Sequence, residues 1–355
     1  MCAVARLPFK QAAIPMENIS PDRVRLTVSE AQTLSEDVLR RAGYDAEEAH
    51  IIANHVMDAA LCGYEYSGLP KILNVIEHPL LREPRSRMRA IRETPNSVLY
   101  DGGNNSGMVT MNHAAQAAIA KAREQGMAMV GVNNSWMSGR SAHYVELVAR
   151  AGLVGIHSVS SRQHVAAPGS KGPVTGTNPV AFGFPTLTDP LVIDLGTSAF
   201  MGTDLQFRER VGTLLPEGVA MDAEGNLTRD PSKVATILPF GGASGYKGFA
   251  LSLAMQALGV LAGSGFGDDK IYGYFIMAID PERMLPAGDF RRHMSDMLAK
   301  VKAAPRQPGV DEIRLPGERS VRERARLTRE GLEIDLKIYD ALLAVPAGTL
   351  PPLGG

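Results

Sequence analysis

The segment MAMVGVNNSWMSGRSAHYVELVARAGLVGIHSV, residues 127–159, decides the fold class. Its apolar run at 127–132 predicts a strand, the pattern at 139–151 predicts a helix, and the run at 153–159 predicts a second strand. Further apolar runs that predict strands lie at residues 179–185, 191–195 and 271–279. Strands that alternate with helices in this way indicate an α/β or α+β chain.

Two helices are predicted ahead of this region. The expected capping-box pairs are Ser29 with Gln32 and Asp45 with Glu48. Apolar residues recur at helical spacing through the second helix, and Gly43 and Gly63 are expected to end the two helices.

A strand at 97–100 is expected to reach a turn at Asp101-Gly102-Gly103, and a helix at 108–125 follows. The apolar segment 249–262 is too short to cross a bilayer, so it is interpreted as a buried helix. Residues 289–303 predict an amphipathic helix.

Composition excludes several classes of protein. The 355 residues carry a formal net charge of −1 with no basic stripe, so nucleic acid is not an expected partner. Only Cys2 and Cys62 occur, which argues against a disulfide framework and favours a reducing, cytoplasmic compartment. Residues 1–21 lack the unbroken apolar stretch of an export signal, and no membrane association is expected.

Several common motifs are absent from the sequence. It contains no Gly-x-Gly-x-x-Gly fingerprint and no P-loop, so a standard Rossmann domain is not supported. It also contains no His-Glu-x-x-His, no Cys-x-x-Cys and no Gly-x-Ser-x-Gly pattern. No metal site and no serine-hydrolase site are therefore expected.

Four ordered segments carry a resemblance to a known family. They are Asp58-Ala-Ala-Leu-Cys-Gly-Tyr-Glu-Tyr-Ser-Gly68, Gly176-Thr-Asn-Pro-Val-Ala181, Ile193-Asp-Leu-Gly-Thr-Ser198 and Tyr246-Lys-Gly-Phe-Ala-Leu251. No segment is specific alone, but the ordered set resembles the type-2 malate/L-lactate dehydrogenase family, from about residue 27 to 345. That family also contains ureidoglycolate, sulfolactate and diketogulonate enzymes and cyclic imino-acid reductases.

The resemblance implies a non-Rossmann α/β (α+β) fold, a homodimer, a small-molecule substrate, and NADPH or NADH as cofactor. The implied organisation is an N-terminal tail at 1–26, a helical region at 27–80, a flanking or dimerisation domain made of 81–125 with 285–355, and an NAD(P)-binding domain at 126–284. The partner subunit is expected near the N-terminal helices or Trp136. The sequence does not distinguish NAD from NADP.

Cofactor contacts are expected from residues in the matching segments. They are Ser160, Gly176, Thr177, Asn178, Pro179, Asp194, Thr197, Ser198, Lys247 and Gly248. The turn at 176–179 offers backbone N–H groups, although Asn178 capping its own backbone is an equally simple explanation. Thr197 and Ser198 are expected to close a strand and open a helix, either facing an anion or acting as an ordinary N-cap. The segments 176–179 and 197–198 and residue Lys247 are expected to converge on one cleft.

The sequence departs from the family at the residues implied to be catalytic. Where the family has Ser-His-Gly followed by Arg, this chain has Tyr66, Ser67 and Gly68, followed by Lys71. A second family histidine, in Asn-Ser-x-His-Phe-Gly, is replaced by Met137, and the histidine of a His-Lys-Gly segment by Tyr246.

Tyr66, Ser67 and Lys71 are therefore the catalytic candidates, with Tyr66 the preferred proton donor. The expected substrate pocket includes Ser135, Trp136 and Met137, although Trp136 could equally be a core or interface residue. Other histidines that could donate a proton are His143, His157 and His164.

Three functions stay open from the sequence: an NAD(P)H-dependent reductase of a small α-imino or α-keto carboxylate, a scaffold recruited for lyase, isomerase or condensation chemistry, and a non-catalytic binding protein. Because a positioned general acid is missing, malate and lactate are expected to be poor substrates. An iminium carries its proton before hydride arrives, so a cyclic or N-substituted imine is favoured over the matching ketone.

Overall fold

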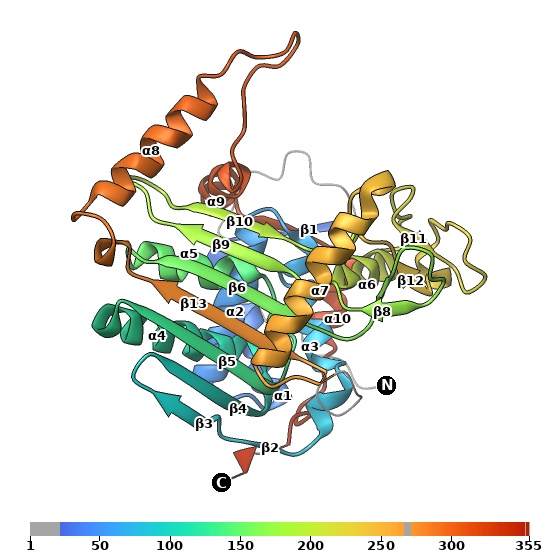
Figure 1. The fold of residues 1–355 in the computed structure, drawn as a ribbon. Coiled ribbons are helices and arrows are strands. Elements are labelled where there is room, and N and C mark those ends of the chain that lie inside the picture. Colours follow the sequence, from blue (N-terminus) through green and yellow to red (C-terminus); the bar gives the residue numbers. More distant parts are fainter. Residues whose placement is uncertain (1–21, 266–270, 352, 355) are drawn as a thin grey trace, which may run out of the picture.

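The computed structural model describes residues 22–265, 271–351 and 353–354. A seven-stranded sheet lies at its centre (Figure 1). From edge to edge its strands are β10 (Leu191–Leu195), β9 (Val180–Phe184), β6 (Val154–Ser160), β13 (Gly273–Ile279), β5 (Met127–Trp136), β4 (Ser97–Ser106) and β3 (Arg89–Thr94). Neighbouring strands pair antiparallel, apart from the parallel β4–β5 pair. The sheet therefore differs from the parallel sheet of a Rossmann domain, in agreement with the prediction from the sequence.

Helices cover both faces of the sheet. Helix α5 (Ser141–Arg150) packs on β6 at Gly155, and α7 (Gly245–Leu261) packs on β6 at Ser160. Residues 155 and 160 of one strand point to opposite faces, so α5 and α7 lie on opposite sides. Helix α4 (Gly107–Gln125) lies against β5 and beside α5.

The helical region combines both ends of the described chain. Its N-terminal elements are β1 (Arg23–Leu26), α1 (Val28–Ala42), α2 (Ala46–Leu61), η1 (Glu65–Ser67) and α3 (Pro70–Ile76). Strand β14 (Leu332–Asp335) pairs antiparallel with β1, and α10 (Leu336–Leu343) contacts α3. One hydrophobic core joins these elements, and it also includes Trp136 from the end of β5.

The remaining elements form a small lobe and the periphery. The lobe has a four-stranded sheet, in the order β11 (Ala220–Met221), β12 (Thr236–Ile237), β7 (Val165–Ala166) and β8 (Pro173–Thr175), together with α6 (Gly202–Val211). The periphery consists of η2 (Pro79–Arg82), β2 (Arg85–Ser86), η3 (Pro231–Lys233), η4 (Gly242–Ser244), η5 (Pro281–Arg283), α8 (Asp289–Lys302), α9 (Glu318–Glu330) and β15 (Leu353–Gly354). Helix α8 extends away from the body (Figure 1).

Most predicted helices and strands are present, and two local predictions were wrong. The first helix begins two residues earlier than expected, because Thr27 and Glu30 form its capping box in place of Ser29 and Gln32. The expected turn at 101–103 lies inside β4, where a register shift against β5 accommodates the positive φ of Gly103.

Two further predictions need correction. No helix opens at Thr197 and Ser198, since α6 begins only at Gly202. Helix α7 is not buried on all sides, because Leu253, Val260 and Leu261 are 46%, 52% and 63% exposed. The sequence pattern identified α7 as apolar, but apolar character alone does not say what covers a helix.

The division into domains stays a prediction. β4 and β5 lie on either side of the expected boundary near residue 125 and share one sheet. Within the described part of the chain, no helix is long and apolar enough to cross a membrane. The tail at 1–26 falls almost wholly outside the described residues.

Candidate active site

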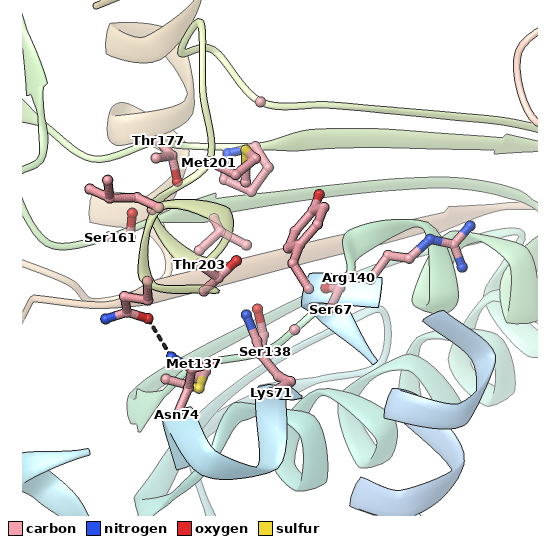
Figure 2. Close-up of a pocket in the computed structure, with 18 of the residues that line it drawn as sticks. Ser67, Lys71, Asn74, Met137, Ser138, Arg140, Ser161, Thr177, Met201 and Thr203 are labelled. Atoms are coloured by element: carbon pink, nitrogen blue, oxygen red, sulfur yellow. Dashed lines mark hydrogen bonds between the residues drawn. The ribbon is translucent and has the colours of Figure 1, made fainter. Parts of the chain in front are cut away.

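A cavity of about 820 Å³ lies between the helical region, the sheet and the small lobe. Its inner side is formed by the η1–α3 segment and by residues 137–141, which follow β5. Its outer side is α6, and the loops after β6 and β10 complete it. Figure 2 shows side chains of these segments pointing toward the same space.

Lys71 is the most unusual residue of the cavity. Pro70 occupies the first position of α3, and all seven residues of this short helix are buried. Lys71 is 4% exposed and lines the cavity, yet its ammonium group has no hydrogen-bond or ion-pair partner among the described residues. Burial lowers the pKa of Lys71 to about 8. An unpaired buried ammonium is costly and favours an anionic ligand.

Tyr66 and Ser67 enter the cavity from η1, directly before α3. Burial, followed by the charges of Asp204 and Asp194, raises the pKa of Tyr66 above its usual range. A phenol with a raised pKa is a weaker acid, so this environment disfavours the expected donor role of Tyr66. The role itself stays a prediction.

The segment after β5 presents a different surface from the one expected. Met137 lines the cavity in a left-handed conformation, φ 56°. Ser135 lies behind the cavity, where its hydroxyl donates to Asn105 O at 2.7 Å. Trp136 is 1% exposed, donates to Asn104 O and stacks at 4.4 Å on His78, which does line the cavity. Trp136 is thus a core residue that supports the wall, and its expected nearness to a partner subunit stays a prediction.

The turn at 176–179 is held in place by hydrogen bonds of the Asn178 side chain to other parts of this chain. Asn178 is fully buried, and its Oδ1 accepts from Ser161 N at 3.1 Å. Its Nδ2 donates to Ser252 O and Gln256 Oε1 on α7, at 3.1 Å each. The side-chain amide is therefore already paired, whereas Thr177 and Pro179 line the cavity.

The other expected cofactor contacts separate into two groups. Thr197 joins the turn, since its N–H donates to Thr177 O at 3.0 Å. Asp194 lines the cavity and accepts from Ala142 N at 2.7 Å, at the start of α5. Desolvation by the surrounding protein raises the pKa of the Asp194 carboxyl, although the side chain itself is exposed to the cavity.

The second group lies away from the cavity lining. It consists of Ser160, Ser198, Lys247 and Gly248. Of the turn and its support, Gly176, Asn178 and Thr197 are not lining residues either. Ser198 donates to Phe200 O, and the buried Ser160 bonds to Ser264. Lys247 is exposed in the first turn of α7. The expected convergence therefore joins 176–179, Thr197 and α7, while Lys247 itself lies outside the cavity lining.

The alternative histidines occupy three different places. His157 is fully buried, and its Nδ1 pairs with Phe275 O at 2.9 Å. His143 Nδ1 lies 3.5 Å from Asp58 Oδ2, away from the cavity lining. His164 lines the cavity, and burial lowers its pKa. None of these positions marks a proton donor by itself.

The sequence reasoning missed Arg140 and α6. Arg140 lines the cavity and pairs with Asp58 at 2.6 Å, and Asp58 also holds Arg324 of α9 at 2.7 Å. Burial would raise the pKa of Asp58, but its hydrogen bond to His143 and the two arginines hold it below its usual range. The position of Arg140, three residues after Met137, was the available signal, whereas α6 carries no motif.

The cations around the cavity differ in whether they are paired. Arg140 is paired with Asp58, and Arg210 with Glu77. Arg162 is exposed, and Lys71 is buried. Among the described lining residues, Lys71 is therefore the buried cation left for a ligand.

Comparison with known proteins places most of the chain in one family. A model of the malate/L-lactate dehydrogenase family matches residues 26–343. L-sulfolactate dehydrogenase of Methanothermobacter thermautotrophicus is 30% identical, over 91% of this chain and 96% of that protein. A Δ1-pyrroline-2-carboxylate/Δ1-piperideine-2-carboxylate reductase of Pseudomonas putida is 28% identical, over 88% and 94%. The crystal structure of malate dehydrogenase from Entamoeba histolytica superposes with a TM-score of 0.84, at 25% identity, over 91% and 97%.

Proposed function

Because the chain belongs to the malate/L-lactate dehydrogenase family, we propose that it is an NAD(P)H-dependent reductase of a small carboxylate in which Lys71 anchors the substrate's carboxylate group. The observation that carries the proposal is the buried, unpartnered ammonium of Lys71. It occupies the position where the family resemblance implies an arginine anchor. A carboxylate bound there supplies the missing counter-charge.

The substrate is a 2-imino carboxylate, preferred over the matching 2-oxo acid. Ser67 and Met137 stand where the resemblance implies histidines, and the phenol of Tyr66 is a weakened acid. Ketone reduction requires a proton at the developing alkoxide, whereas an iminium is already protonated. The Asp194 carboxyl in the same cavity favours a cationic reacting group.

The cavity residues fit a nicotinamide beside this substrate. Its volume of about 820 Å³ exceeds the needs of a small carboxylate alone. Thr177 and Pro179 would hold the carboxamide side of the ring, since the side chain of Asn178 is paired elsewhere. The bound cofactor supplies the hydride, and the chain supplies position and charge.

The test is a steady-state comparison of pyruvate, oxaloacetate, malate and lactate with Δ1-piperideine-2-carboxylate, using NADH and NADPH. The imino acid is expected to show at least about tenfold higher kcat/KM than either oxo acid. Efficient turnover of malate or lactate would contradict the substrate preference. Failure to bind either nicotinamide would contradict the reductase itself and favour recruited, non-redox chemistry.

The protein is also proposed to be a homodimer that covers the outer face of α7. Leu253, Val260 and Leu261 leave an apolar strip on this helix, which a monomer would expose to water. Sedimentation at micromolar concentration is expected to give a dimer, and the pair Leu253→Glu and Val260→Glu a monomer. A 38 kDa species for the unaltered chain would exclude the dimer.

A further inference from the structure

The inner side of the cavity is held from behind by a buried histidine. His55 lies on α2 and is 1% exposed, with its ring 4.7 Å from that of His143 and 5.3 Å from that of Tyr144. Its Nε2 accepts the main-chain N–H of Arg140 at 2.8 Å. Arg140 is the N-cap residue of α5 and provides no side-chain cap of its own. Two distant side chains accept N–H groups at this helix start: His55 accepts that of Arg140, and Asp194 accepts that of Ala142.

Three further contacts fix the same turn. The hydroxyl of Tyr144 donates to Ser138 O at 2.5 Å, and the Arg140 guanidinium pairs with Asp58. Gly139 has φ 74°, and a Cβ there would overlap His55 Nε2. The turn and the imidazole are thus fitted against each other, with no room for a side chain between them.

The protonation state of His55 agrees with an acceptor role. Burial lowers the pKa of His55 well below its usual range, so the imidazole is neutral. With Nε2 accepting, the proton sits on Nδ1, which has no hydrogen-bond partner within the described chain. An unpaired buried donor is unfavourable, and an apolar side chain would avoid it. The hydrogen bond that His55 Nε2 accepts from Arg140 N offsets this cost, because Arg140 N has no other acceptor among the described residues.

We infer that His55 is a positioning residue, which holds the 137–140 turn so that Ser138 and Arg140 face the carboxylate subsite of Lys71. The functional part of this inference rests on the proposed anchor role of Lys71. His55 does not line the cavity, so it acts only through the turn.

The experiment compares His55→Leu, which removes the acceptor, with His55→Gln, whose amide oxygen can replace it. The matched control is His157→Leu, because His157 is equally buried but pairs with Phe275 O and reaches the turn only indirectly, through its edge-on contact with the ring of Tyr144 at 5.3 Å. The readouts are the Kd of pyrrole-2-carboxylate, a planar analogue of a cyclic imino acid, the Kd of NADPH, and KM and kcat for Δ1-piperideine-2-carboxylate.

His55→Leu is expected to raise the analogue Kd and KM at least about tenfold, with kcat and the NADPH Kd changed less than about threefold. His55→Gln is expected to restore most of the affinity. His157→Leu is expected to lower the Tm without changing the analogue Kd. Equal impairment of His55→Gln and His55→Leu, or a loss in His157→Leu that matches the loss in His55→Leu, would overturn the inference.

Hydrogen exchange separates this inference from the proposed function. The peptide spanning residues 137–144 is expected to exchange faster in His55→Leu than in His55→Gln, whether or not any substrate binds. If His55→Leu does not fold, Gly139→Ala displaces the same turn while keeping the histidine and is expected to raise the analogue Kd similarly. Unchanged exchange in both disruptive variants would remove the positioning role, whereas faster exchange without analogue binding by the unaltered chain would fault only the proposed anchor.

Discussion

The two sides of the cavity are built differently. The inner wall, made of Ser67, Lys71, Met137, Ser138 and Arg140, is backed by the main hydrophobic core and by His55 and Asp58. The outer wall is α6, which has no buried residue. It is tied to the inner side by the hydrogen bond from Asn74 to Gln206, at 2.5 Å (Figure 2), and by the Arg210–Glu77 ion pair.

This difference suggests a division of roles, in which the inner wall holds the reacting groups and the outer wall adjusts to the shape of the substrate. Groups that must hold a charge in place lie on the wall that cannot move without disturbing the core. The outer wall is only partly buried: Phe207 and Val211 of α6 pack against that core, whereas its contacts across the cavity are polar side-chain pairs that cost little to rearrange. We therefore expect substitutions in the inner wall to affect turnover and stability, and substitutions in the outer wall to shift substrate affinity only slightly.

The strongest test of this comparison is Lys71→Met. It removes the anchoring charge at nearly constant volume, so kcat/KM for the best imino acid should fall roughly 30- to 1000-fold. This corresponds to a loss of about 2–4 kcal/mol of transition-state stabilisation. Lys71→Arg keeps the charge and should retain most of the activity. Steady-state kinetics measures both variants, and an unaffected Lys71→Met enzyme would move the substrate site elsewhere.

The second test is the pH dependence of stability. The pKa of Lys71 is about 8 in the folded chain and 10.5 in the unfolded chain. Between these values the unfolded chain binds the additional proton, so raising the pH through this window favours folding. Below pH 8 Lys71 is protonated in both states, so the folded chain bears the full cost of burying the ammonium group. The difference between the two pKa values sets this cost at about 3 kcal/mol of folding free energy.

Lys71→Met should therefore be more stable than the unaltered chain at pH 7, with an advantage that shrinks toward pH 10. Urea denaturation of both proteins at several pH values measures this difference. A constant difference across the range would show that Lys71 does not titrate in this window.

The third test weakens the support behind the inner wall. Asp58→Asn leaves Arg140 and Arg324 without their shared carboxylate and should destabilise the fold by about 2 kcal/mol at pH 7. The pKa of Asp58 is held below its usual range, so its contribution is present at neutral pH and is lost on acidification. Denaturation should show that the difference in free energy of unfolding between the two proteins decreases below about pH 4. If the difference persists there, it comes from packing and not from the charge of Asp58.

The smallest effect is expected in the outer wall. Gln206→Ala and Arg210→Ala remove polar contacts at the surface and should each cost less than about 1 kcal/mol, with KM changed by less than about fivefold. Kinetics with the same imino acid provides the measurement. A loss as large as that of Lys71→Met would show that α6 belongs to the fixed machinery after all.

Local patterns predicted elements better than they predicted surroundings. Asp45 and Glu48 form the expected capping box, because such a cap depends on neighbours in sequence. The positive φ of Gly103 serves a bulge in place of a turn, since the choice depends on the partner strand β5. The exposed face of α7 could not be deduced either, because burial depends on what packs against a helix.

The candidate site shows the same division. Ser67 and Lys71 were identified because they stand within an ordered motif, and both line the cavity. Arg140 and Gln206 were missed, because their position depends on contacts with distant residues, such as Asp58 and Asn74. Trp136 was expected in the pocket, but as the last residue of β5 it packs in the core, and Met137, which follows the strand with φ 56°, lines the cavity in its place.

The pairing of β1 with β14 has a consequence for synthesis of the protein. Residues 23–26 hydrogen-bond with residues 332–335, so the helical region that carries Lys71 lacks its final strand until most of the chain has left the ribosome. Closing a loop of this size is slow, and the apolar faces of α1 and α2 wait uncovered meanwhile. The nascent chain therefore passes through a stage at which all strands of its central sheet have been synthesised but the region around Lys71 still lacks its last strand.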